Sequence, residues 1–165
     1  MKVLFVNPEI RLDGEPYSIS IGLGILASIA ENKGADVGIL DLNALRMNYG
    51  GHSVPNNKIE EELLTEKWDI IGIGGLTTTY SRMKELIPLL RKCAPNALII
   101  SGGGWSTYNP DEILKLIPQI DMICIGEGEE TFSEVYDQVK QGTCDFEGIA
   151  GLCIRDKDAS IFTKP

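Results

Sequence analysis

Histidine is almost absent from this chain: His52 is the only one, and the four cysteines are scattered at positions 93, 124, 144 and 153. No two cysteines form a Cys-x-x-Cys pair, and a structural zinc site needs four convergent ligands. We therefore predict no metal-ligating residue. Cys124 and Cys153 lie inside apolar runs, where a free cysteine is most simply a core residue.

Basic residues and long apolar runs are also scarce. Fifteen Lys and Arg stand against 24 Asp and Glu, for a net charge of −9. This balance argues against nucleic acid or an anionic membrane as a partner, because both attract basic surfaces. No apolar run reaches the roughly 18 residues of a membrane helix, and Met1–Pro8 is too short an apolar stretch for a signal peptide. We expect a cytoplasmic protein.

Two nucleotide-binding motifs are missing. The P-loop pattern Gly-x-x-x-x-Gly-Lys-Ser/Thr does not occur, and no Gly-x-Gly-x-x-Gly follows the first predicted strand. The glycines of IGLGIL at Ile21–Leu26 lie within a predicted helix, and we interpret them as allowing close helix–sheet packing. A phospho-receiver domain is disfavoured, since Asn7-Pro8 and Ile73-Gly74-Gly75 stand where it needs acidic residues.

Five apolar runs of strand length, rich in Ile and Val, punctuate the 165 residues at positions 3–6, 37–40, 70–73, 97–100 and 122–125. None alternates with polar residues, which is typical of strands buried on both faces of a parallel sheet. Helical patterns lie between them. The first would bury Ile21, Ile25, Leu26 and Ile29 and end at Lys33-Gly34; others cover residues 59–63, 83–90 and 132–139, and Asn109-Pro110 marks a further helix start.

Alternating strands and helices predict an α/β fold: a flavodoxin-like (Rossmann-like) three-layer α/β/α sandwich with a five-stranded parallel sheet. We assign residues 1–145 to this domain and residues 146–165 to a C-terminal hairpin. The hairpin would pair Ile149–Arg155 with Ser160–Phe162 through a turn at Asp156–Asp158. The polar, glycine-containing stretch Arg46–Asn57 is expected to be a surface loop.

The segments that follow the predicted strands are rich in glycine and hydroxyl groups. Parallel sheets bind ligands beyond the carboxyl ends of their strands, and glycine lets a ligand lie against the backbone. Alternatives stay open: the glycines could be turn residues, threonines 77–79 could cap the next helix, and Glu129 and Glu130 suit the first turn of a helix. Glu127, between two glycines, is harder to explain by structure alone.

In order and spacing, these segments resemble the N-terminal cobalamin-binding (vitamin B12-binding) domain of class B radical S-adenosylmethionine enzymes of the methyltransferase and cyclase type. The resemblance covers nearly the whole chain. It is carried by VLFVNP at Val3–Pro8, IGLGILASIAENKGADVGILD at Ile21–Asp41, DIIGIGGLTTTY at Asp69–Tyr80, IISGGGWST at Ile99–Thr107, IGEGEETF at Ile125–Phe132 and GIAGLCIRD at Gly148–Asp156.

The resemblance implies cobalamin as the cofactor. It places a Ser/Thr-containing loop after the third strand, a glycine loop against the nucleotide tail after the fourth, and Glu127-Gly128 at one wall. Replacing Gly103 by Leu should then block the tail and leave the sheet folded. No catalytic residue is predicted. The cofactor-binding set is Asn7, Pro8, Leu76, Thr77, Thr78, Thr79, Gly102, Gly103, Gly104, Trp105, Glu127 and Gly128.

Two motifs of related proteins are missing. The Asp-x-His-x-x-Gly pattern that supplies an axial histidine is absent, so cobalamin would bind without a protein histidine, and His52 is read as a solvent-side residue. The Cys-x-x-x-Cys-x-x-Cys motif is absent too. S-adenosylmethionine and a [4Fe-4S] cluster would therefore belong to a missing downstream radical domain of the same polypeptide.

We thus expect a domain fragment with no turnover of its own, whose parent enzyme performs methyl transfer or a rearrangement. The alternative is a degenerate domain that binds no cofactor and serves as a docking or substrate-pocket module.

Overall fold

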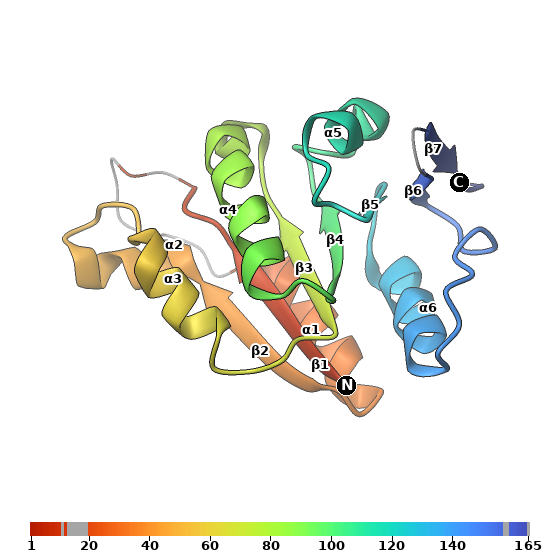
Figure 1. Ribbon diagram of the computed structural model, residues 1–165, viewed down its shortest axis with the longest axis horizontal. Helices are drawn as coiled ribbons and strands as arrows, with labels where there is room; N and C mark the ends of the chain where they lie inside the picture. The colour runs from red at the N-terminus through yellow and green to blue at the C-terminus, as the bar shows by residue number, and fades with distance from the viewer. Residues whose placement is uncertain (11, 13–19, 157–158, 165) are drawn as a thin grey trace.

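A seven-stranded sheet forms the centre of the molecule, in the order β2-β1-β3-β4-β5-β6-β7 (Figure 1). The computed structural model describes residues 1–10, 12, 20–156 and 159–164. The first five strands are parallel, and the last two are antiparallel to their neighbours. The strands are β1 (Lys2–Asn7), β2 (Asp36–Asp41), β3 (Ile70–Gly74), β4 (Leu98–Gly102), β5 (Met122–Cys124), β6 (Leu152–Asp156) and β7 (Ala159–Phe162).

Helices cover both faces of the sheet, which confirms the predicted three-layer, flavodoxin-like fold. One core lies under α1 (Ile21–Asn32) and α6 (Glu129–Lys140). The other lies under α3 (Asn56–Leu63), α4 (Tyr80–Cys93) and α5 (Pro110–Leu116). In Figure 1, α4 lies in front of the strands and α1 behind them. The short elements are α2 (Leu42–Leu45) and the 3₁₀ turns η1 (Arg46–Tyr49) and η2 (Thr77–Thr79).

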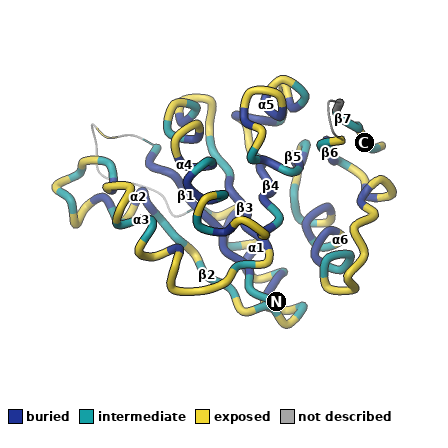
Figure 2. The backbone as a smooth tube through the Cα atoms, in the orientation of Figure 1, coloured by how far each residue is buried: buried dark blue, intermediate teal, exposed yellow. Residues whose placement is uncertain are grey.

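Burial differs between the strands. Strands β1, β3 and β4 are buried over most of their length, as the central dark segments of Figure 2 show. The prediction of burial on both faces is wrong for β2, which forms one edge of the sheet and leaves Ile39 54% exposed. An edge strand has a neighbour on one side only, so its apolar residues are covered less completely.

The buried face of α1 differs from the predicted one. Leu23, Ala27 and Ala30 face the core, whereas Ile21 is 75% and Ile25 42% exposed. The reason is steric: small alanines let the helix approach the sheet more closely than isoleucines would. The interpretation of the two IGLGIL glycines as packing residues is also wrong, because no atom of the sheet or of another element lies within 4 Å of where a Cβ would stand on either.

The stretch Arg46–Asn57 is not the predicted surface loop. It contains η1 and the beginning of α3, and it buries two residues almost completely, Arg46 and Val54, each 1% exposed. One Arg46 guanidinium nitrogen donates to the Gly51 carbonyl at 2.9 Å. The polar composition of this stretch led to a wrong prediction of exposure. Its arginine can be buried because backbone carbonyl and side-chain oxygens accept its hydrogen bonds.

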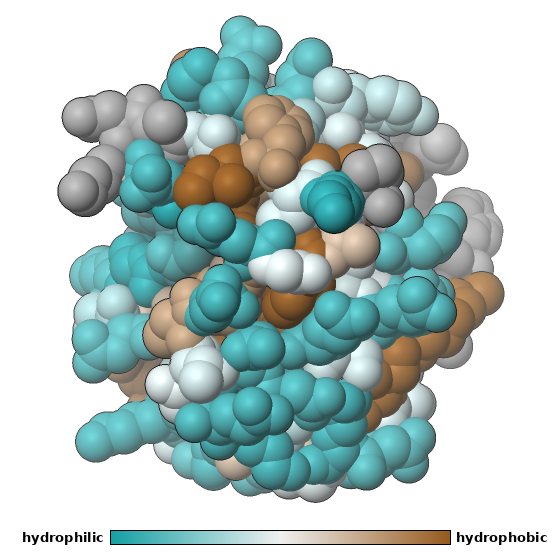
Figure 3. All heavy atoms as spheres, turned by 90° about the vertical axis from the view of Figure 1, so that its right-hand side faces the viewer, coloured by the Kyte–Doolittle hydropathy of each residue, from teal (hydrophilic) through white to brown (hydrophobic). Residues whose placement is uncertain are grey.

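The predicted C-terminal hairpin is present, and it extends the main sheet. β6 pairs antiparallel with β5, and Cys153 of β6 stands opposite Phe162 of β7. The predicted turn includes residues 157 and 158, which lie outside the described residues. The side of the molecule that carries these strands is mostly hydrophilic, with hydrophobic residues in separate patches (Figure 3). Among the described residues, no helix has the length and apolar character to cross a membrane.

A buried ion pair fixes the segment that follows β1. The Arg82 Nε of α4 donates to a Glu9 carboxylate oxygen at 2.9 Å, and the other carboxylate oxygen accepts from the Val54 backbone N–H at 2.9 Å. The Glu9 side chain is 2% exposed and that of Arg82 13%. A carboxylate buried this deeply needs its partners, because burial of an unpaired charge is costly.

Replacing Arg82 by Met should therefore lower the free energy of unfolding by about 3–5 kcal/mol, the usual cost of leaving one member of a buried pair. Urea denaturation followed by circular dichroism measures this loss. The matched control is Lys92→Met, which removes an exposed pair with Glu60 and should leave the urea midpoint unchanged. Equal midpoints for the two variants would contradict the role given to the buried pair.

Candidate functional site: a glycine-lined cavity

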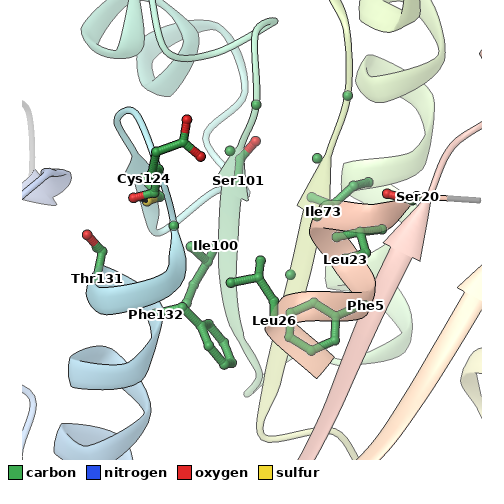
Figure 4. A pocket seen from close by; sticks show the side chains of 18 of the residues that line it. Phe5, Ser20, Leu23, Leu26, Ile73, Ile100, Ser101, Cys124, Thr131 and Phe132 are labelled. Atoms are coloured by element: carbon green, nitrogen blue, oxygen red, sulfur yellow. Dashed lines mark hydrogen bonds between the residues drawn. The ribbon is translucent and has the colours of Figure 1, made fainter. Parts of the chain in front are cut away.

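A cavity of about 370 Å³ opens at the carboxyl ends of β1, β3, β4 and β5 and reaches down between α1 and α6 (Figure 4). This is the edge at which parallel sheets bind ligands. Nine of the chain's 18 glycines line it: Gly22, Gly72, Gly74, Gly75, Gly102, Gly103, Gly104, Gly126 and Gly128. Half of the glycines are thus gathered at one site, which favours a ligand over nine unrelated turns.

The inner part of the cavity is apolar. Leu23 and Leu26 approach it from α1 and Phe132 from α6, while Phe5 and Ile100 come from the sheet between them (Figure 4). The rings of Phe5 and Phe132 lie 5.3 Å apart between centroids and are tilted by 59°. Such walls suit a flat, apolar group better than a charged one.

Gly72, in the middle of β3, is required by the ring beside it. A Cβ at this position would stand 2.7 Å from the Phe5 ring. The absence of a side chain at position 72 therefore allows Phe5 to lie across the strand at the inner end of the cavity.

The loops after β3 and β4 pack backbone against backbone. Gly74 and Gly102 are opposite each other at the ends of the two strands. Gly103 has a φ of +81°, and a Cβ there would meet the Gly75 carbonyl oxygen at 2.8 Å. The expectation that Gly103→Leu would leave the fold intact is therefore wrong, because such a side chain would collide with the neighbouring loop.

Three other glycines leave space open. Apart from the adjoining residues and the backbone of the helix itself, no atom lies within 4 Å of where a Cβ would stand on Gly22, Gly104 or Gly126. All three line the cavity, so we expect a side chain at these positions to reduce the room for a ligand at the cavity or its mouth.

The polar side chains of the cavity are largely committed to the protein itself. The Asn7 amide donates to an Asp41 carboxylate oxygen at 2.9 Å, which holds the end of β1 against the next strand. The Thr131 hydroxyl donates to the Ala150 carbonyl at 3.0 Å. Burial raises the pKa of the Cys124 thiol, which keeps it protonated at neutral pH. The Ser101 hydroxyl is wholly buried and has no hydrogen-bond partner among the described residues.

Charge at the cavity is acidic. Glu127 and Glu129 line it, and no Lys, Arg or His does so among the described residues. The same residues contain no group of three or more His, Cys, Asp or Glu side chains that could hold a metal ion. Such a site is poorly suited to a polyphosphate, which binds to basic side chains or to the backbone N–H groups of a P-loop.

Of the twelve predicted cofactor-binding residues, seven line the cavity: Asn7, Leu76, Gly102, Gly103, Gly104, Glu127 and Gly128. The other five do not: Pro8, Thr77, Thr78, Thr79 and Trp105. Thr77 and Thr78 are exposed beside the rim. Thr79 is 2% exposed, and its hydroxyl donates a hydrogen bond to the Leu76 carbonyl at 2.7 Å. The indole of Trp105 is buried against the Tyr80 ring, and the two ring centroids lie 6.3 Å apart.

Sequence reasoning missed the walls supplied by the helices. Leu23, Leu26 and Phe132 have the periodicity of core residues, and nothing in that pattern separates a core side chain from one that faces a cavity. Gly22 did carry a signal, since a glycine in the first turn of a helix lowers helix stability and calls for a reason.

These features define a class: an α/β domain with an apolar, glycine-lined ligand cavity at the carboxyl ends of its strands. The family profile of the B12 binding domain matches residues 12–136. The chain belongs to this family.

Several known proteins are similar in sequence to this chain. It is 27% identical to the cytidylyl-2-hydroxyethylphosphonate methyltransferase of Streptomyces wedmorensis, over 99% of this chain and 33% of that protein. It is 22% identical to the anaerobic magnesium-protoporphyrin IX monomethyl ester cyclase of Rubrivivax gelatinosus, over 100% of this chain and 30% of that protein. The chain thus spans about a third of the length of these relatives.

A solved structure shares the fold. The cobalamin-dependent S-adenosylmethionine radical enzyme OxsB, with aqua-cobalamin and S-adenosylmethionine bound, superposes with a TM-score of 0.77 at 18% identity, over 99% of this chain and 22% of that one. The predicted resemblance to the cobalamin-binding domains of radical S-adenosylmethionine enzymes is confirmed.

The two neighbouring glycines 103 and 104 should respond differently to the same change. Gly103→Ala should lower the free energy of unfolding by about 1–3 kcal/mol, the cost of a non-glycine residue held at positive φ, with the 2.8 Å contact added. Gly104→Ala should change it by no more than about 0.5 kcal/mol, because its Cβ has open space. Urea midpoints of the two variants, compared with the parent, test the backbone packing; similar losses in both would contradict it.

Proposed function

We propose that this domain binds cobalamin, with the nucleotide tail in the glycine-lined cavity and the corrin ring above its rim. The observation that carries the proposal is the gathering of nine glycines around an apolar cavity at the carboxyl ends of the strands. Membership of the B12 binding domain family supports the choice of ligand.

The residues present fit this group in size and chemistry. The cavity volume of about 370 Å³ lies within the usual range of about 300–1,000 Å³ for small-molecule sites. The walls of Leu26, Ile100 and Phe132 suit the flat aromatic base of the tail. Gly22, Gly104 and Gly126 leave open space where other residues would carry side chains. The buried Ser101 hydroxyl, which has no hydrogen-bond partner among the described residues, leaves a hydrogen bond to be made.

In this proposal the chain binds and orients the cofactor. The tightly packed loops at Gly75 and Gly103 form the rim against the tail, and Glu127-Gly128 closes one wall. Thr77 and Thr78, exposed beside the rim, are placed to meet the parts of the cofactor outside the cavity. Pro8, Thr79 and Trp105 shape the loops from behind. When bound, cobalamin supplies methyl-transfer or radical chemistry at its cobalt.

We further propose that the catalytic half lies in a downstream domain of the same polypeptide, which would carry S-adenosylmethionine and a [4Fe-4S] cluster. The relatives named above are about three times as long as this chain, which supports that division of labour. The parent would be a cytoplasmic radical enzyme of methyl transfer or rearrangement. The present chain, with residues 1–145 as the cofactor domain and 146–165 leading onward, would have no turnover alone.

Binding is tested directly by mixing the protein with hydroxocobalamin, desalting, and recording the visible spectrum. Near-stoichiometric cobalamin absorbance is expected. Gly104→Leu should abolish most of the retention while keeping the circular dichroism spectrum, because Gly104 lines the cavity and a Cβ there meets no other part of the protein. The matched control is Gly148→Leu, at an exposed position with open space away from the cavity. A colourless parent protein would favour the degenerate-domain alternative.

The cobalt should receive no ligand from a protein histidine. His52 is exposed and does not line the cavity, and the sequence between β1 and α1, residues 8–20, contains no histidine. The electron paramagnetic resonance spectrum of the cobalt(II) form should therefore show no nitrogen superhyperfine splitting from imidazole, and His52→Ala should leave it unchanged. A nitrogen splitting that disappears in His52→Ala would contradict this part of the proposal.

A further inference from the structure

We infer that the cavity selects among cobamides by the lower base of the tail, accepting a benzimidazole and discriminating against a purine. Cobamides share the corrin ring and differ in this base. The inference rests on the proposed function, since it concerns the group that would enter the same cavity. It comes from the balance of apolar surface and free hydrogen-bonding groups in the inner part of the cavity.

The inner walls offer a bicyclic aromatic base apolar contact on several sides. Leu26 lies beside the N-terminus of α6, where its methyl carbon would be 3.7 Å from a Cβ on Gly128. Phe132 and Ile100 are 5% and 7% exposed, and both line the cavity. The Phe5 ring stands against Phe132. Benzimidazole and adenine are similar flat bicycles, so these contacts alone do not distinguish them by shape.

Hydrogen-bonding capacity does distinguish the two bases. The Thr131 hydroxyl already donates a hydrogen bond to the Ala150 carbonyl. The Cys124 thiol is a weak donor directed at the Glu127 carbonyl, 3.9 Å away. The only wholly buried hydroxyl that lines the cavity without a partner among the described residues belongs to Ser101. Among the buried side chains that line the cavity, the Ser101 hydroxyl is therefore the one strong donor to spare within the described residues.

A benzimidazole attached through one nitrogen has one further ring nitrogen, which asks for one donor. An adenine has three further ring nitrogens and an exocyclic amine that needs acceptors. The side chains of the cavity offer partners to few of these groups, so most would lose a hydrogen bond to water on entering it, and burial of unpaired polar groups weakens binding. Discrimination of about 10- to 100-fold is expected, the range that polar mismatches in apolar pockets produce.

The experiment is a titration of the parent protein, by isothermal calorimetry and tryptophan fluorescence, with four corrinoids: cobalamin, the adenine-containing cobamide, the cobamide with a cresol base, and cobinamide, which has no base. Cobalamin and the cresol form should bind most tightly, because neither brings several polar groups into the cavity. The adenine form should bind at least about tenfold more weakly, and cobinamide more weakly than cobalamin.

The outcomes separate this inference from the proposed function. If none of the four corrinoids binds, the proposed function fails. If cobalamin binds and the adenine form binds within about threefold of it, the proposed function stands and the selectivity is overturned. Equal binding of cobinamide and cobalamin would also overturn the selectivity, because the base would then make no contact in the cavity.

A pair of neighbouring substitutions on α1 assigns the selectivity to the apolar wall. Leu26→Asn places an amide at the cavity and should narrow the ratio of the two dissociation constants at least about threefold. Ile25→Asn makes the same change one residue away, at a side chain that is 42% exposed, and should leave the ratio as it is. Equal ratios in both variants would overturn the assignment. If Leu26→Asn fails to fold, the corrinoid series on the parent protein still decides the selectivity.

Discussion

The close approach of two loop backbones is the constraint on which this domain depends. Gly75 and Gly103 touch where β3 and β4 end, with no room for a side chain between them. Because these loops pack against each other, the rim of the cavity has a fixed position even though β3 and β4 both end in glycine. That rim lies over a cavity that closer packing of α1 and α6 against the sheet would otherwise fill.

The position of α1 follows from this arrangement. Its alanines at 27 and 30 contact the sheet near the far end of the helix, while Leu23 and Leu26 border the open volume at its beginning. Large side chains on the inner face near the C-terminus would hold the whole helix away from the sheet. The isoleucines at 21 and 25, which an amphipathic pattern would place inside, point outward instead.

Much of the architecture could be read from the sequence, because each buried strand is a short run of Ile and Val and each helix has recognisable ends. The hairpin at the C-terminus was also predictable. Burial was harder wherever it depended on a neighbour: the exposure of Ile39 follows from the edge position of β2, and the burial of Arg46 follows from oxygens that surround it in the folded chain.

Only part of the cavity lining was predictable, because only the residues that directly follow the strands could be placed. Glycines after parallel strands converge wherever the strands converge, so Gly102–Gly104 and Gly128 could be placed from spacing alone. Thr79 and Trp105 could not, since adjacent residues in a tight turn point in different directions. Leu26 and Phe132 were missed because apolar periodicity reports the side of a helix that faces inward and does not reveal an unfilled space on that side.

The contact between Phe5 and Gly72 has a consequence for how this sequence can change over time. A methyl group at position 72 would fall 2.7 Å from the ring, so an alanine there is excluded as long as a phenylalanine occupies position 5. A smaller residue at position 5 would remove the obstacle and also enlarge the cavity. The two positions, 67 residues apart on adjacent strands, are therefore expected to vary together among descendants of this gene, and the order of the two substitutions matters: the ring must shrink before the glycine can be replaced.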